Sequence, residues 1–177
     1  MTKNARNIKN LSMAALCLAL AMVLPFATGQ IPQLGSMLCP MHIPVLLCGF
    51  ICGPFYALIV GLIAPVLRFL LFGMPPIFPT GLAMCFELAC YGLVAGLLYR
   101  ALPKKTGNIY IALLVAMLVG RIVWGVATMI ILGISGSGLT WAAFISSAFI
   151  NSLPGIILHI LIIPPIVMAL CKAKLCD

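Results

Sequence analysis

Residues 41–100 read MHIPVLLCGFICGPFYALIVGLIAPVLRFLLFGMPPIFPTGLAMCFELACYGLVAGLLYR. Nearly every residue in this stretch is apolar, yet Arg68 and Glu87 lie inside its hydrophobic runs. Glycine and proline at 53–54 and 73–79 divide it into three apolar segments joined by short turns. A charge inside a bilayer is costly, so such residues usually face a cavity, a partner or a substrate path. The stretch therefore predicts transmembrane helices and marks the two charges as candidate functional residues.

The composition of the chain identifies its class. Hydrophobic residues make up 64% of the 177 residues, charged residues make up 7%, and the mean hydropathy is +1.28. A soluble domain carries about 25% charged residues, so this chain could not cover a water-facing surface. The apolar runs do not alternate as in a pore-type barrel, and backbone groups in lipid must pair internally. We predict an all-α integral membrane protein with one domain over residues 1–177.

The apolar segments predict a compact bundle of six transmembrane helices, since each span takes about 20 residues. The segments cover approximately residues 11–28, 41–52, 54–72, 79–102, 109–132 and 140–171. The second is short for a span. The last is too long for one straight span, so Pro154 and the pair Pro164-Pro165 must bend or extend it. Small residues four apart predict dense packing of the second to fourth helices. These pairs are Gly49 and Gly53, Ala57 and Gly61, and Gly92 and Gly96.

The basic residues outside the apolar runs predict the topology. They are Lys3, Arg6, Lys9, Arg100, Lys104, Lys105, Lys172 and Lys174. With six helices they fall at one side of the membrane, in residues 1–10, 100–108 and 172–177. The opposite loops near 29–40, 73–79 and 133–139 carry no Lys or Arg. The positive-inside rule then predicts that both termini and the 100–108 loop are cytoplasmic. Residues 29–40 are expected to form an outer lid loop.

The net charge of +8 does not indicate a nucleic-acid partner. The basic residues lie beside apolar runs and not in a patch with interleaved aromatic residues. We interpret them as topology markers of a multi-pass protein in a lipid bilayer.

Four polar residues inside the predicted spans are the first candidates for a binding site: Arg68, Glu87, Arg121 and Asn151. The predicted topology places all four in the outer half of the bundle. Arg68 could instead extend its side chain to the outer interface. Glu87 could form a structural ion pair with Arg121 or Arg68, and we expect at least one such pair. Arg121 is too deep to reach the interface and is the strongest candidate.

Helical spacing adds neighbours to these residues. Tyr91 lies one turn from Glu87, and Trp124 shares a face with Arg121. His42, at the outer end of the second segment, is expected either to cap the site or to be solvated. His159 is expected to bond a neighbouring helix more readily than a ligand. Aromatic and polar groups near charges suit a small polar ligand, although an aromatic stripe is more often ordinary packing.

No catalytic pattern is visible. Glu87 is the only acid in the predicted spans, so there is no carboxylate pair for acid–base or two-metal chemistry. HExxH, GxSxG and phosphate-cradling motifs are missing. The cysteines lie mostly in apolar runs, where a free thiol acts as a small hydrophobe. We therefore predict no enzyme, metal or cofactor, and expect any active transport to draw energy from a partner or an ion gradient.

The chain resembles the substrate-binding S components of energy-coupling factor (ECF) vitamin transporters, in the pantothenate- or pyridoxine-like branch. The resemblance is carried by MHIPVLLCGFICGP (41–54), the GMPP turn (73–76) and FELACYGLVAGLLYR (86–100), together with the six-helix layout. It implies a prokaryotic plasma-membrane protein that binds a vitamin or precursor from outside. The resemblance also implies that the protein topples in the membrane when a transmembrane coupling subunit and two cytoplasmic ATPases drive transport. Ala15 and Ala19 match the family's docking pattern, although small-xxx-small spacing also serves simple packing.

The vitamin is inferred from charge. Two intramembrane arginines against one glutamate leave an excess of one positive charge, which favours an anionic ligand in low dielectric. Pantothenate fits best and pyridoxine next, and riboflavin, thiamine or a pyrimidine precursor stay open. The main alternative is a stand-alone proton-coupled carrier that uses Glu87. A membrane enzyme and a purely structural subunit are the other classes.

Overall fold

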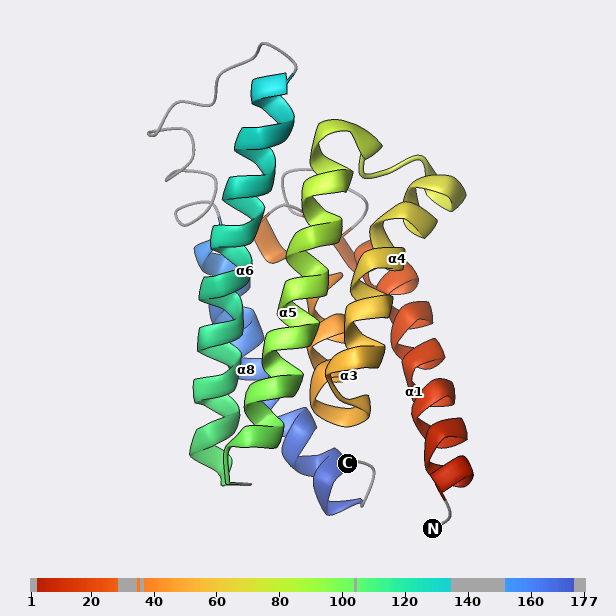
Figure 1. Cartoon of the computed structure of the whole chain (residues 1–177), viewed down its shortest axis with the longest axis vertical. Coiled ribbons are helices and arrows are strands. Elements are labelled where there is room, and N and C mark those ends of the chain that lie inside the picture. The colour runs from red at the N-terminus through yellow and green to blue at the C-terminus, as the bar shows by residue number, and fades with distance from the viewer. Residues whose placement is uncertain (1–2, 29–34, 36, 104, 135–151, 174–177) are drawn as a thin grey trace.

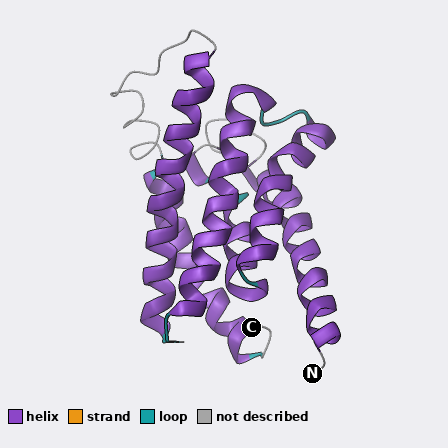
Figure 2. Cartoon of the chain, in the orientation of Figure 1, coloured by secondary structure: helices purple, strands orange, loops and turns teal. Residues whose placement is uncertain are grey.

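The computed structural model describes residues 3–28, 35, 37–103, 105–134 and 152–173. Within these ranges the chain forms helices and connecting turns without a strand, as Figure 2 shows. The α-helices are α1 (Lys3–Val23), α3 (His42–Cys52), α4 (Pro54–Phe72), α5 (Leu82–Ala101), α6 (Thr106–Ile134) and α8 (Leu153–Lys172). Two short helical turns accompany them, η1 (Leu24–Thr28) after α1 and η2 (Ile77–Gly81) before α5. The all-α prediction is confirmed.

Five of the described helices are long and apolar enough to cross a membrane, and α3 is shorter, with 11 residues. The short second helix predicted from the sequence is therefore present, and it is buried along its whole length. α8 begins beside Pro154 and continues through Pro164 and Pro165. The earlier part of the predicted last segment, up to residue 151, lies outside the described residues.

Glycines let α3, α4 and α5 approach closely. A Cβ on Gly61 would lie 2.5 Å from the backbone of Leu88, and one on Gly96 would lie 2.6 Å from the backbone of Pro54. A Cβ on Gly92 would lie 2.8 Å from the Ala57 carbonyl oxygen. Such separations leave no room for a side chain, so only glycine fits. This confirms the dense packing predicted from the small-residue pairs.

The ends predicted to be cytoplasmic lie together. Figure 1 shows the start of α1, the end of α8 and the turn from α5 to α6 at one end of the bundle. The turn between α3 and α4 is at the same end, because Gly53 (φ +93°) lies against the Arg100 guanidinium. A basic end is thus a feature of the fold. The assignment of this end to the cytoplasm stays a prediction from the charge distribution.

α1 presents two different faces. Ala14, Cys17 and Ala21 are buried against the bundle, whereas Ala15 and Ala19 are exposed. Helical spacing explains this division, since residues three or four apart share a face. The predicted docking pair therefore lies on the outward face of α1 and does not serve packing within the described chain.

The buried cysteines behave as predicted, with free thiols at Cys17, Cys48 and Cys52. Cys171 differs from them, because it is half-buried and disulfide-bonded.

Candidate functional site

Glu87 is the centre of a buried polar cluster. Its carboxylate oxygen Oε1 accepts a hydrogen bond from the Tyr91 hydroxyl at 3.1 Å, one helical turn further along α5. The same oxygen lies 3.1 Å from Nη1 of Arg121 on α6. Glu87 is 1% exposed and Tyr91 is 2% exposed, so these contacts form away from water. The ion pair predicted between Glu87 and one of the arginines is confirmed for Arg121.

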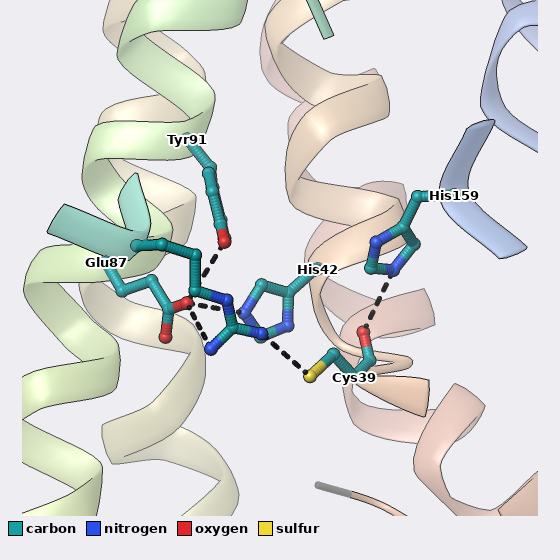
Figure 3. Close-up of polar contacts among 6 residues, drawn as sticks. Cys39, His42, Glu87, Tyr91 and His159 are labelled. Carbon is teal, nitrogen blue, oxygen red and sulfur yellow. Dashed lines mark hydrogen bonds and ion pairs between the residues drawn. The ribbon is translucent and has the colours of Figure 1, made fainter. Parts of the chain in front are cut away.

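Histidines extend the cluster to two more helices (Figure 3). His42 begins α3, and its Nε2 lies 3.5 Å from Glu87 Oε1. That is an ion-pair distance if the ring is protonated, without hydrogen-bond geometry. The His42 ring packs edge-on against Tyr91 and stacks on His159 of α8, with centroids 5.1 and 6.0 Å apart. His42 is 2% exposed, so the expectation that it could be solvated is wrong.

Cys39 closes the cluster from the connection before α3. Its sulfur accepts a hydrogen bond from Nη2 of Arg121 at 3.4 Å, and its carbonyl oxygen lies 3.3 Å from Nε2 of His159. The carbonyl also accepts the backbone N–H of His42 at 3.0 Å. Cys39 has φ +47°, a left-handed conformation that is costly for a residue with a Cβ. This conformation aims the side chain and the carbonyl at two different cluster residues.

The cluster lies far from the basic end of the bundle. Glu87 precedes Arg100 by 13 residues on α5, which corresponds to about 20 Å along the helix axis at 1.5 Å per residue. α3, α5, α6 and α8 each contribute a side chain. The cluster therefore lies toward the end of the bundle opposite the basic end, and the assignment of that end to the outer side stays a prediction from the charge distribution.

Several buried polar atoms of this region have no hydrogen-bond partner among the described residues. They are His42 Nδ1 and Nε2, Arg121 Nε, Thr128 Oγ1 and His159 Nδ1. An unsatisfied buried polar group costs about 1–3 kcal/mol, and native proteins keep few of them. Donors and acceptors of this kind are what a polar ligand would satisfy. Thr128 places one of these unpaired groups further along α6, seven residues beyond Arg121.

Arg68 does not join the cluster. Its Nη1 donates a hydrogen bond to the Met22 carbonyl oxygen at 2.7 Å, and its guanidinium lies 5.6 and 5.3 Å from the ring centroids of Phe26 and Phe72. Arg68 is 4% exposed, so other residues of the chain cover its guanidinium. It joins α4 to the end of α1 and to η1.

Because Arg68 lies outside the cluster, the net charge of the cluster differs from the net charge predicted from the sequence. The predicted excess of one positive charge counted Arg68 together with Arg121. Among the described residues of the cluster, the charges of Arg121 and Glu87 offset each other.

The remaining predicted site residues are Trp124 and Asn151, and neither has a described contact with the cluster. Trp124 is half-buried on α6, one turn beyond Arg121. Asn151 lies outside the described residues, as do most positions of the predicted 29–40 lid. The described residues contain no group of three or more His, Cys, Asp or Glu side chains that could hold a metal ion.

Sequence reasoning missed two members of the cluster. Cys39 lies in a connection without periodicity, so no helical spacing relates it to Arg121. His159 is expected to bond a neighbouring helix; its ring stacks on His42 of α3, and its hydrogen-bond contact is with the Cys39 carbonyl oxygen just before that helix. The two prolines at 32 and 40 mark the connection as irregular, but the left-handed conformation of Cys39 has no signal in the sequence.

Comparison with known proteins identifies the family. The chain matches the model of the family described as ECF transporter, substrate-specific component, over residues 9–167. Neither the curated proteins nor the solved structures contain a match to the chain. The matched range includes every described helix in whole or in large part, and the polar cluster lies within it. The chain belongs to the family of substrate-specific components of ECF transporters.

Proposed function

We propose that this chain captures a water-soluble vitamin or vitamin precursor at the polar cluster around Glu87, as the substrate-binding subunit of an ECF importer. The observation that carries the proposal is the convergence of Glu87, Tyr91, Arg121, His42 and His159 from four helices. These groups are buried, lie far from the basic end, and retain unpaired donors and acceptors. A small ligand with several hydrogen-bonding groups would satisfy them.

The ligand candidates are pantothenate and pyridoxine. The excess of positive charge predicted from the sequence favours pantothenate, but in the structure Glu87 offsets Arg121, and Arg68 bonds to Met22. A neutral ligand with several hydrogen-bonding groups, such as pyridoxine, therefore fits the cluster at least as well as a carboxylate. Arg121 Nε and the histidine nitrogens would contact either ligand, and Trp124 would contact it from the next turn of α6. Arg68 is proposed to hold helices together and not to touch the ligand.

The energy for uptake is proposed to come from a transmembrane coupling subunit and two cytoplasmic ATPases in a prokaryotic plasma membrane. Support for this comes from the family and from the exposed Ala15 and Ala19 on α1. Small residues on an outward helix face allow another helix to approach closely. Replacing both with leucine should weaken co-purification with the coupling subunit and leave ligand binding intact. A matched control replaces Val115 and Val126, which are exposed on α6, with leucine.

The test of the binding function is thermal stabilisation of the purified chain by pantothenate, pyridoxine, riboflavin and thiamine in turn. A single-site ligand at a hundredfold excess over its Kd stabilises the folded state by about 2.7 kcal/mol. One vitamin should raise the melting temperature selectively, and Arg121→Ala should abolish the shift. A chain that no vitamin or precursor stabilises would contradict the proposal.

The alternative is a proton-coupled carrier with Glu87 as its proton site. Such a carrier would have to break the Glu87–Arg121 pair in each cycle. It would accumulate substrate in liposomes that contain this chain alone under a pH gradient, whereas a substrate-binding subunit would not. Uptake by the chain alone would favour the carrier.

A further inference from the structure

The basic end of the bundle contains a groove between α5, α6 and α8. Its volume is about 380 Å³, within the range of roughly 300–1,000 Å³ that is usual for ligand sites. The described residues that line it are Tyr99, Lys105, Thr106, Ile109, Met168, Cys171 and Lys172. Lys105 precedes α6 and Lys172 ends α8, so two helices bring their cations to one groove.

The chain supplies almost no acidic partners for its cations. It has ten Lys and Arg residues but only two acidic residues, Glu87 and Asp177. Glu87 is about 20 Å away along α5 and is paired with Arg121. Lys105 and Lys172 are exposed and have no ion pair among the described residues. Among the described residues, no acidic side chain supplies counter-charge to this groove.

The groove combines polar and apolar groups in the manner of a headgroup site. Lys105, Lys172 and the Thr106 hydroxyl offer donors to an anion, while Ile109 and Met168 offer apolar surface. The Tyr99 hydroxyl lies 3.2 Å from the Cys171 sulfur and joins α5 to α8 across the groove. The groove opens where helices expected to span the bilayer end, which is where lipid phosphates lie. Basic pockets between helices on the cytoplasmic side bind anionic lipid headgroups.

We propose that this groove binds the phosphodiester headgroup of an anionic phospholipid, with Lys105 and Lys172 as the principal contacts. Phosphatidylglycerol is the simplest lipid of this chemistry. Inorganic phosphate shares the phosphate chemistry but lacks the acyl chains that Ile109 and Met168 would contact. The site is separate from the vitamin site and does not depend on the proposed function.

The test counts lipids bound to the purified full chain by native mass spectrometry. Palmitoyl-oleoyl phosphatidylglycerol is compared with phosphatidylcholine of the same acyl chains. The Lys105→Gln/Lys172→Gln variant removes the two contacts, and Lys3→Gln/Arg6→Gln removes two charges from the start of α1. Each lysine near an anionic lipid contributes about a fivefold preference, so the first variant should lose roughly 30-fold in affinity for phosphatidylglycerol. The control variant should retain the wild-type preference.

Three outcomes would overturn the proposal. One is equal binding of the two lipids by the wild-type chain. Another is an equal loss of affinity for phosphatidylglycerol in both variants, which would indicate a general effect of surface charge and not a specific site. The third is full displacement of phosphatidylglycerol by inorganic phosphate but not by chloride of equal ionic strength, which would indicate a site for free phosphate. Both variants should keep their vitamin-induced stabilisation, which separates this test from that of the vitamin site.

Discussion

The guanidinium of Arg121 and the carboxylate of Glu87 lie 3.1 Å apart in the interior of the bundle, so α5 and α6 each carry the counter-charge of the other. Both side chains are at least nine-tenths buried. Each charge would be costly in this environment without its partner. The ion pair therefore holds α5 and α6 together at the polar cluster.

Breaking this pair on one side should be more harmful than removing it altogether. Glu87→Gln or Arg121→Met alone leaves a buried charge uncompensated, and each should lower the free energy of unfolding by about 3–5 kcal/mol. The double variant should be destabilised by much less than the sum of the two. A double-mutant cycle on unfolding in detergent measures the coupling. Additive losses would show that the pair does not contribute as a unit.

Gly120→Ala should disturb the cluster without changing a polar residue. The Tyr91 ring covers Gly120 on α6, and a Cβ at that position would collide with the ring. Overpacking of this kind costs about 1–3 kcal/mol. The Tyr91 hydroxyl should also lose its bond to Glu87, so vitamin affinity should fall together with the melting temperature. Gly133→Ala on the same helix is the control, because no atom of the described residues lies within 4 Å of the added Cβ. Unchanged vitamin affinity in Gly120→Ala would argue against a role for Tyr91 in the site.

Gly92→Ala should separate α4 from α5. Its Cβ would press on the backbone of Ala57, which cannot rotate away as a flexible side chain can. We expect a loss of at least about 1–3 kcal/mol in the free energy of unfolding. Gly107→Ala, in the open first turn of α6, should be neutral or slightly stabilising because alanine is the better helix former. Equal stability of the two variants, measured by thermal unfolding, would contradict the close approach.

Cys39 offers a test of backbone strain. Cys39→Ala and Cys39→Gly both remove the sulfur that accepts the bond from Arg121. Only glycine relieves the cost of φ +47°, so the glycine variant should be more stable than the alanine variant by about 1 kcal/mol. Both variants should bind the vitamin more weakly than the wild type does. An alanine variant as stable as the glycine variant would show that the left-handed conformation carries no cost.

Arg68 and Arg121 should respond differently to substitution. Arg68→Leu removes the bond to the Met22 carbonyl and should lower the melting temperature. Since Arg68 lies outside the cluster, the vitamin Kd of this variant should stay within a factor of about two. Arg121→Ala should instead abolish detectable binding. Isothermal titration of the two variants distinguishes the roles, and a large loss of affinity in Arg68→Leu would return Arg68 to the ligand site.

The sequence predicted those features that depend on spacing along one helix or on composition. The Glu87–Tyr91 contact follows from an interval of four residues on α5. The close approach of α3, α4 and α5 follows from small residues one turn apart. The basic end follows from the positions of lysine and arginine between apolar runs.

Features that depend on how helices rotate about their axes could not be predicted. The choice of Arg121 over Arg68 as the partner of Glu87 is one of these, because both arginines were placed at suitable depths. The orientation of α4 about its own axis directs Arg68 toward Met22 and not toward Glu87. Cys39 was missed for a different reason, since its role depends on an irregular backbone.

α1 is attached to the bundle at both ends. Near the basic end, the Asn10 side-chain amide donates to the Cys52 carbonyl oxygen of α3 at 3.5 Å, and at the other end the Met22 carbonyl accepts from Arg68 of α4. Ala15 and Ala19 lie between these two attachments. A partner that presses on them would push a helix that is hydrogen-bonded near each end and packed along its inner face, so the force would pass into α3 and α4 together. The start of α3 carries His42, so a push on the outer face of α1 would act on a helix that contributes to the proposed binding site.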